Sequence, residues 1–321
     1  MSGPPKDLVG VEDVPHGRTA QRLEWEYLPP MTRRVVEEHL GAKVARADSQ
    51  GSGFTPGLAS VLTGENGATL FLKAASKMAQ RPFAEAYAEE ARKHRLLPAG
   101  LPVPRLSWVH DDDLWILLGF DRVEGRPPTR PWQPTELTAC LDSLAVVADR
   151  MNPVPRAFEL KPITEDLPGL LTGYDYLREH HPDRPHLDDA AALAATYGTF
   201  PGNDAFAHTD ARDDNFLITG DGRALLCDWN WPALGPVWLD AVSVLVSAYG
   251  DGLDADAVLA EHPLTRDAVP DHVDAWLAML AGFMLQARER PVPSSSPYLR
   301  VHANWWAEAT WSWLAARRGW R

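Results

Sequence analysis

Three polar residues in the second half of the chain have the types and spacing of a phosphoryl-transfer site. Asp210 and Asn215 lie in the run HTDARDDN, and Asp228 follows a short apolar segment further along. Transfer of a phosphate from ATP needs a carboxylate that orients the attacking hydroxyl, and it needs oxygen ligands that hold Mg²⁺ on the phosphates. We therefore take Asp210 as the candidate catalytic residue and Asn215 and Asp228 as the candidate metal ligands.

The segment between these residues predicts how they meet. Two apolar runs, 216–218 and 224–227, flank a GDG turn. This pattern indicates an antiparallel hairpin, which would bring Asn215 and Asp228 side by side. The alternative is a solvated loop followed by an ordinary hairpin, because Asp and Asn are common in turns.

The same segment resembles the aminoglycoside phosphotransferase and choline kinase family, a branch of the protein-kinase-like fold. Asp240, in the run GPVWLD, resembles a family residue that supports the catalytic loop from beneath, as His208 is also implied to do. The sequence departs from the family at Ala211, where a larger apolar residue is usual, and we expect a change in packing more than in chemistry. The pattern HxDxxxxN with a later Asp-Trp pair comprises His208, Asp210, Asn215, Asp228 and Trp229.

A glycine-rich run lies between the first two of three expected strands, 44–47, 59–63 and 69–74, the last two joined by a GENG turn. In a kinase the nucleotide loop has this place, and glycines let backbone amides approach phosphate. Within the run QGSGFTPG we expect Ser52, Gly53 and Phe54 to contact phosphate. A glycine-rich turn without a ligand is the alternative.

Lys73 lies in the strand LFLKA, where its apolar neighbours indicate burial. A buried ammonium needs an anionic partner. The expected helix 84–97 offers three glutamates, and the family resemblance favours Glu90 as the partner. If each residue is taken alone, a snorkelling lysine and a solvated glutamate are the alternatives.

The apolar strand 114–120 runs into DRVEGRPP. A buried strand that ends in such a turn is typical of the hinge between two lobes, where backbone groups can bind an adenine edge. The resemblance implies that the carbonyl of Asp121 and the amide of Val123 make those contacts. We place the lobe boundary here, with a mobile arm over 1–18, a nucleotide-binding lobe over 19–124 and a helical lobe with the substrate site over 125–321.

The fold class that follows is α+β, a bilobal protein-kinase-like fold with a small antiparallel sheet and a larger, mostly helical lobe. The helical spacing of 19–40 is interrupted by Pro29-Pro30 and predicts two helices that cap the first lobe. The tryptophans of the last segment are expected to pack that helix onto the lobe, with the alternative that one of them lines the substrate pocket. Further helices are expected over 135–150, 188–197, 241–249, 255–260, 273–287 and 302–317.

Composition narrows the function. The 321 residues are 45% hydrophobic and 23% charged, which suits two folded lobes, and the net charge of −13 argues against a nucleic-acid partner and is compatible with a cationic substrate. No apolar run spans a bilayer and no signal peptide is evident, so we expect no membrane partner and a cytoplasmic location. Cys140 and Cys227 are interpreted as core residues.

These patterns together predict a phosphotransferase that uses ATP and Mg²⁺ to phosphorylate a hydroxyl of a small molecule. The resemblance implies an aminoglycoside-like antibiotic or a metabolite as acceptor. The chain between Asp228 and Asp240 is too short for a long activation segment, which favours small acceptors over folded proteins. A kinase that phosphorylates Ser or Thr of a peptide precursor, and a degenerate nucleotide-binding protein, are the alternatives.

Overall fold

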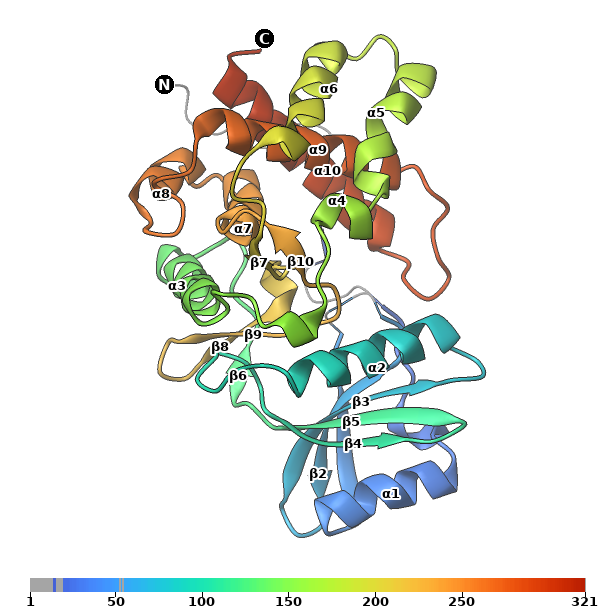
Figure 1. The fold of residues 1–321 in the computed structure, drawn as a ribbon. Helices are drawn as coiled ribbons and strands as arrows, with labels where there is room; N and C mark the ends of the chain where they lie inside the picture. Colours follow the sequence, from blue (N-terminus) through green and yellow to red (C-terminus); the bar gives the residue numbers. More distant parts are fainter. Residues whose placement is uncertain (1–13, 16–19, 52, 54, 321) are drawn as a thin grey trace.

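The computed structural model describes residues 14–15, 20–51, 53 and 55–320. The arm expected over 1–18 lies almost entirely outside the described residues, as do Ser52 and Phe54. The described chain has the expected α+β architecture, in which a small lobe built on an antiparallel sheet joins a larger, mostly helical lobe (Figure 1).

The sheet of the small lobe has five antiparallel strands in the order β1-β2-β3-β5-β4. The strands are β1 (Val44–Ser49), β2 (Leu58–Gly64), β3 (Thr69–Ser76), β4 (Leu106–Asp111) and β5 (Trp115–Asp121). At the GENG turn between β2 and β3, Gly67 has a φ of 82°, a left-handed conformation that favours glycine. β3 pairs with β2 and β5, so Lys73 is held on a strand with neighbours on both sides.

Two helices cover opposite faces of this sheet, α1 (Pro30–Leu40) and α2 (Arg81–His94) (Figure 1). Alternate residues of β5 explain the arrangement, because successive side chains of a strand point to opposite faces. Leu117 packs in one buried cluster with Val36 of α1, whereas Leu118 packs in another with Tyr87 of α2. The small lobe therefore has a core on each side of its sheet.

The segment before α1 differs from the prediction of two helices. Among the described residues of this segment the structure has a single short 3-10 helix, Trp25–Tyr27. The amide of Gln21 donates to the carbonyl of Ser295 at 2.8 Å, and the amide of Leu23 donates to the carbonyl of Pro56 at 3.4 Å. These peptide groups are bonded to distant segments, so the first predicted helix is wrong.

The large lobe contains two small sheets and most of the helices. β6 (Gly125–Arg126), β8 (Phe216–Thr219) and β9 (Ala224–Leu226) form one sheet, and β7 (Ala205–Ala207) pairs with β10 (Ala233–Gly235). The helices are α3 (Pro134–Arg150), α4 (Ile163–Asp166), α5 (Gly169–His180), α6 (Leu187–Thr196), α7 (Leu239–Gly250), α8 (Ala255–Glu261), α9 (Pro270–Ala287) and α10 (Leu299–Arg318), with 3-10 turns at Arg156–Phe158, Tyr197–Thr199 and Asp213–Asn215.

The sequence pattern does not predict α4 and α5, because prolines interrupt the helical spacing of this region. Pro162 and Pro168 occupy the N-cap positions of these helices. Proline is tolerated at a helix start, where the missing N–H would have no partner in the helix. The prolines therefore begin helices here.

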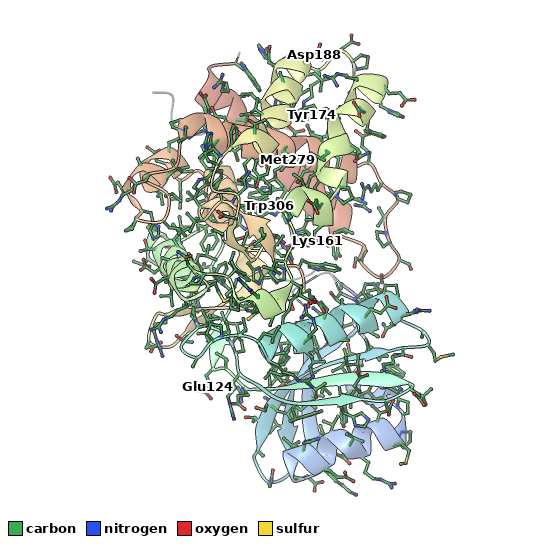
Figure 2. All side chains as sticks on the ribbon, viewed as in Figure 1. Glu124, Lys161, Tyr174, Asp188, Met279 and Trp306 are labelled. Carbon is green, nitrogen blue, oxygen red and sulfur yellow. The ribbon has the colours of Figure 1, made fainter. Side chains whose placement is uncertain are left out.

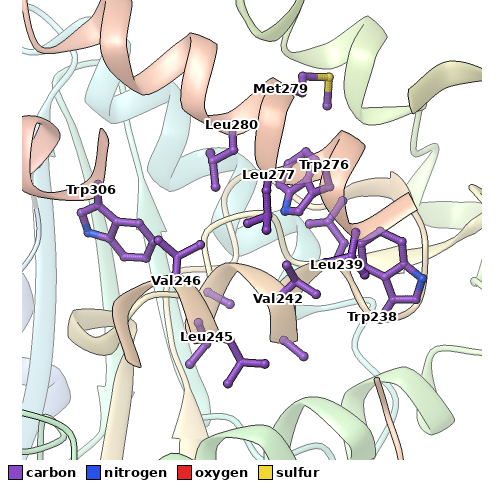
Figure 3. Close-up of a cluster of buried hydrophobic side chains, with 14 of the residues drawn as sticks. Trp238, Leu239, Val242, Leu245, Val246, Trp276, Leu277, Met279, Leu280 and Trp306 are labelled. Carbon is purple, nitrogen blue, oxygen red and sulfur yellow. The ribbon is translucent and has the colours of Figure 1, made fainter. Parts of the chain in front are cut away.

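The core of the large lobe is centred on α7, α9 and α10 (Figure 3). α5 crosses α9 at close range, because a Cβ added to Gly173 would lie 2.3 Å from the carbonyl oxygen of Gly282. The Tyr174 hydroxyl donates to the carbonyl of Ala278 at 2.7 Å and fixes the crossing. These helices thus hold a rigid wall next to the catalytic segment.

Among the described residues no helix is long and apolar enough to cross a membrane. Cys140 is buried in the core of the large lobe, as expected. Cys227 is only partly buried and lines a cavity, so its interpretation as a core residue is wrong.

Candidate active site

The β8–β9 hairpin brings the two candidate metal ligands to the same end of the sheet. Gly222, with a φ of 80°, forms the tight turn at the far end. At the near end the amide of Cys227 donates to the carbonyl of Asn215 at 2.8 Å. Asn215 therefore faces Cys227 and Asp228 is the next residue, so both candidate ligands lie at this end of the hairpin, as the sequence pattern predicts.

The loop that carries Asp210 is held by Asp240 at the start of α7. The Asp240 carboxylate accepts from the backbone amides of His208 and Thr209 at 2.6 and 2.8 Å. Thr209 has a φ of 64°, which is strained for a branched residue, and its hydroxyl donates to the carbonyl of Trp231 at 2.6 Å. Strain of this kind persists only where the surroundings impose it, so these bonds set the direction of Asp210.

The ring of His208 lies beneath this loop. It is fully buried and meets the Trp229 ring edge-on, with centroids 5.2 Å apart. Burial lowers the pKa of His208 to about 3, so the imidazole is neutral at physiological pH. A neutral, packed ring suits a supporting role for His208.

The Asp210 carboxylate lies within hydrogen-bonding distance of a candidate metal ligand. The side-chain amide of Asn215 donates to Asp210 Oδ2 at 2.9 Å and to its carbonyl at 2.8 Å. Arg212 pairs with Asp210 and also with Asp214, the latter at 2.9 Å. Burial raises the pKa of Asp210 to about 6, against the opposing effect of Arg212. A carboxyl with this pKa can accept a proton near neutral pH.

Lys73 joins the two lobes. Its ammonium contacts Glu90 at 2.8 Å and also pairs with Asp228 across the interface. Burial alone would lower the pKa of Lys73, but the carboxylates of Asp228 and Glu90 outweigh it and raise this pKa above its usual range. For Asp228, burial would raise the pKa, but the cations Lys73 and Arg22 prevail and lower it. Both groups are therefore charged, as a site for phosphate and metal requires.

A first cavity extends from Asp228 along the hinge, and we call it the nucleotide cavity. Ala59, Val61, Phe71 and Leu217 give it apolar walls that could enclose a flat ring. The expected contact residues Gly53, Asp121 and Val123 all border it, together with Lys73, Glu90 and Asn215.

The side chain of Asp121 pairs with Arg105 at 2.6 Å, which leaves the backbone of this segment to face the cavity. Glu124, just beyond the hinge, is labelled in Figure 2.

The donor set at this cavity fits Mg²⁺. The amide nitrogen of Asn215 is engaged by Asp210, so its side-chain oxygen and the Asp228 carboxylate remain as hard oxygen ligands. Among the described residues no group of three or more His, Cys, Asp or Glu side chains could hold a metal by itself. Mg²⁺ in kinases takes few protein ligands and completes its shell with phosphates and water, so two protein ligands suffice.

The sequence profile of the phosphotransferase enzyme family matches residues 57–269, and this range contains Lys73, Glu90, Asp210, Asn215 and Asp228. The chain belongs to this phosphotransferase family. The family resemblance drawn from the HxDxxxxN motif is thereby confirmed. A comparison with curated proteins finds no match.

Solved structures similar to this phosphotransferase share its fold at low sequence identity. An aminoglycoside phosphotransferase from Alicyclobacillus acidocaldarius subsp. acidocaldarius is 17% identical with a TM-score of 0.53, and the match covers 91% of this chain and 96% of that one. Choline kinase LicA from Streptococcus pneumoniae is 12% identical with a TM-score of 0.55, over 89% and 99% of the chains. Amicoumacin kinase hAmiN, solved with AMP-PNP, Ca²⁺ and Ami, is 13% identical with a TM-score of 0.52, over 86% and 92%.

A second cavity of about 430 Å³ opens on the other side of Asp228, and we call it the acceptor cavity. Asp210 and Ala211 line it, and Ala211 is buried. The small side chain at 211 thus borders the space next to the Asp210 carboxylate, where a larger residue would occupy volume. Trp306 of α10, labelled in Figure 2, also lines this cavity, and it packs in the core of the large lobe as expected. The other wall residues are Thr55, Ile163, Leu167, Leu170, Thr209, Arg212, Asn230, Trp231, Ser243, Trp276, Leu280, Phe283 and Met284.

Two arginines of the site were not predicted from the sequence. Arg22 lines the nucleotide cavity and spans the glycine-rich loop, since its guanidinium donates to the carbonyls of Gln50 and Thr55, each at 2.7 Å. It lies outside the range that matches the family profile, and nothing in the local pattern marks it. Arg212 could have been noted from its place two residues after Asp210 in the motif.

Proposed function

We propose that this phosphotransferase transfers the γ-phosphate of ATP, with Mg²⁺, to a hydroxyl group of a small molecule. One observation carries the proposal: Asp228 borders both cavities, and Asp210 borders only the acceptor cavity. A phosphate that reaches Asp228 from the nucleotide cavity would meet a hydroxyl held at Asp210. Positioning of this kind supplies much of the catalysis in phosphoryl transfer.

Each residue then has a distinct role. Lys73, fixed by Glu90, would neutralise phosphate charge. Asp210 would accept a hydrogen bond from the acceptor hydroxyl and take its proton, while Asn215 and Arg212 hold the carboxylate in place. Asn215 and Asp228 would hold Mg²⁺, which when bound offsets the charge that develops on the phosphates. The backbone of Gly53, Asp121 and Val123 would contact the nucleotide, and Ser52 and Phe54 are proposed as further contacts on the same loop.

Two features argue against the alternatives. The acceptor cavity is walled by several helices and by loop segments from both lobes, which suits a compact molecule better than a Ser or Thr within a peptide chain. The set Lys73, Glu90, Asp210, Asn215 and Asp228 is complete, whereas a degenerate protein has no need to keep all of it. Residues 19–124 and 125–321 are proposed as the nucleotide and acceptor lobes.

Nucleotide binding to the purified chain tests the proposal. We expect ATP with Mg²⁺ to raise the melting temperature, because a ligand that binds only the folded state stabilises it by about 2.7 kcal/mol at 100 times its Kd. ATP with EDTA should give a smaller rise. Asp228→Asn should abolish the part that depends on Mg²⁺, because it removes the anionic metal ligand.

Asp221→Asn is the matched control, since Asp221 lies on the exposed turn of the same hairpin. It should keep the full magnesium-dependent rise. Absence of any shift with ATP and Mg²⁺ at millimolar concentration, in a wild-type protein that melts cooperatively, would reject the proposed function.

A further inference from the structure

Both ends of α7 are attached to the catalytic segment. At the start of the helix, Asp240 accepts from the amides of His208 and Thr209. At its C-cap, Asp251 forms a second attachment, which passes through Arg130. The body of α7 is buried in the core of the large lobe (Figure 3). The catalytic segment is therefore tied to one rigid element at two separate points.

Arg130 lies between two aspartates that are distant in the sequence. Its Nε and Nη2 donate to the two carboxylate oxygens of Asp251 at 2.6 and 2.8 Å, and its Nη1 pairs with Asp213 at 2.7 Å. The Arg130 side chain is 4% exposed, and its Cζ lies 4.9 Å from the centroid of the Trp305 ring. The Asp251 carboxylate also accepts from the amide of Trp132 at 2.7 Å. A planar guanidinium held in this way fixes direction as well as distance, so Asp213 has a defined place relative to α7.

Asp213 is the first residue of the 3-10 turn Asp213–Asn215, and the last residue of that turn is a candidate metal ligand. The side-chain amide of Asn215 donates to Asp210 Oδ2 at 2.9 Å, so a shift of the turn would move both functional side chains. Neither Arg130 nor Asp213 is among the described residues that line the two cavities. Arg130 therefore acts on the site from outside, through the turn.

We propose that Arg130 is a positioning residue for the metal site, because its pair with Asp213 sets the place of the Asn215 side-chain oxygen. This inference rests on the proposed function, in which Asn215 and Asp228 hold Mg²⁺. Residues that orient metal ligands from outside typically contribute about 10–100-fold to metal affinity. An ion pair that served the fold alone would lower the stability of the lobe and leave the contribution of Mg²⁺ unchanged.

Binding of the ATP analogue AMP-PNP to the full chain tests this inference. Titration calorimetry with EDTA and again with Mg²⁺ gives two dissociation constants, and their ratio measures how much Mg²⁺ strengthens binding, independently of turnover. Arg130→Gln removes the cation between Asp213 and Asp251. Asp213→Ala keeps the pair of Arg130 with Asp251, and thus the fold, but removes the attachment of the turn. We expect this ratio to fall by about tenfold or more in both variants, with the affinity in EDTA close to that of the wild type.

Arg317 of α10 provides a matched control in the same lobe. Its side chain is 10% exposed and also pairs with two aspartates, Asp274 at 2.5 Å and Asp256, beside the ring of Trp313. None of these four residues is among the described residues that line either cavity. Arg317→Gln should lower the melting temperature of the free protein, as Arg130→Gln does, but it should keep the wild-type ratio.

The outcomes separate this inference from the proposed function. If the wild type does not bind AMP-PNP, or if Mg²⁺ does not strengthen the binding, the proposed function is rejected and the inference with it. If Mg²⁺ strengthens binding to the wild type and equally to Asp213→Ala, only the role of Arg130 is overturned. An equal fall of the ratio in Arg317→Gln overturns that role as well, because the loss would then follow from general destabilisation of the lobe. Asp213→Ala decides the question even if Arg130→Gln does not fold.

Discussion

The two cavities that meet at Asp228 are built on opposite principles. The nucleotide cavity is organised by charge: Lys73 bridges Glu90 and Asp228, and Arg22 spans the glycine-rich loop. The acceptor cavity is organised by apolar side chains of helices that are distant in sequence. The charged residues of the first cavity, apart from Arg22, stand in short sequence motifs, whereas the wall of the second is assembled from helices far apart in the chain. The first cavity can therefore be recognised from motifs and the second only from the fold.

Removal of the Asp210 carboxylate should give the largest effect on turnover, and it should affect the acceptor cavity without affecting the nucleotide cavity. Asp210→Ala is expected to lower kcat by between about a hundredfold and ten-thousandfold, the range for a positioned general base. Nucleotide binding should persist, because Asp210 borders the acceptor cavity and not the nucleotide cavity. ADP formation and the thermal shift with ATP and Mg²⁺ measure the two effects. Normal turnover in this variant would remove Asp210 from its role.

Loss of the Lys73 ammonium should have the next largest effect, on stability and on nucleotide binding. Lys73→Met leaves the carboxylates of Glu90 and Asp228 without the cation between them, and breaking a buried pair in this way costs about 3–5 kcal/mol. We expect a lower free energy of unfolding in urea and the loss of nucleotide binding.

The double variant Lys73→Met/Glu90→Gln provides the check on that cause. It removes one of the two uncompensated charges, so it should recover part of the stability and none of the nucleotide binding. Equal stability of the single and double variants would show that charge pairing is not what stabilises this contact.

Arg22 should have a smaller effect, confined to the nucleotide cavity. Arg22→Gln removes the bonds to the carbonyls of Gln50 and Thr55, and a hydrogen bond that involves a charged group contributes about 1.5–3 kcal/mol net of the competing bonds to water. We expect KM for ATP to rise by about tenfold, with KM for the acceptor unchanged. Arg46→Gln, on the exposed edge of β1, is the matched control. A rise confined to the acceptor KM would contradict this assignment.

The difference between the two cavities also explains which parts of the fold and of the site could be predicted from the sequence. The bilobal fold and the catalytic hairpin follow from short local patterns, since strand alternation and a GDG turn bring Asn215 and Asp228 together without reference to the rest of the chain. The wall of the acceptor cavity does not follow from local patterns. Trp276, Leu280 and Phe283 have the spacing of a helix face that packs in a core. An apolar stripe has the same spacing whether protein or a cavity lies against it, so the cavity is revealed only by the way α5, α7, α9 and α10 pack around it.

The pH dependence of stability should also differ between the two sides of the site. His94 of α2 lines the nucleotide cavity with 4% of its side chain exposed, and burial lowers its pKa to about 4. Between pH 6.5 and 4 the unfolded chain binds a proton at this residue that the folded chain does not. Stability from this group is therefore complete above pH 6.5 and falls as the pH drops, by up to about 1.4 kcal/mol per pH unit.

His94→Gln should reduce the slope of melting temperature against pH between pH 6.5 and 5, because it removes the group that titrates only in the unfolded chain. The slope should not vanish, since His208 is also buried and its pKa is lowered to about 3. The acceptor cavity has no histidine among its described wall residues, so Trp306→Phe should leave the slope as it is in the wild type. Equal slopes in the wild type and His94→Gln would mean that the folded protein protonates His94 as readily as the unfolded chain, and the ring would then add a positive charge beside Lys73 in the nucleotide cavity.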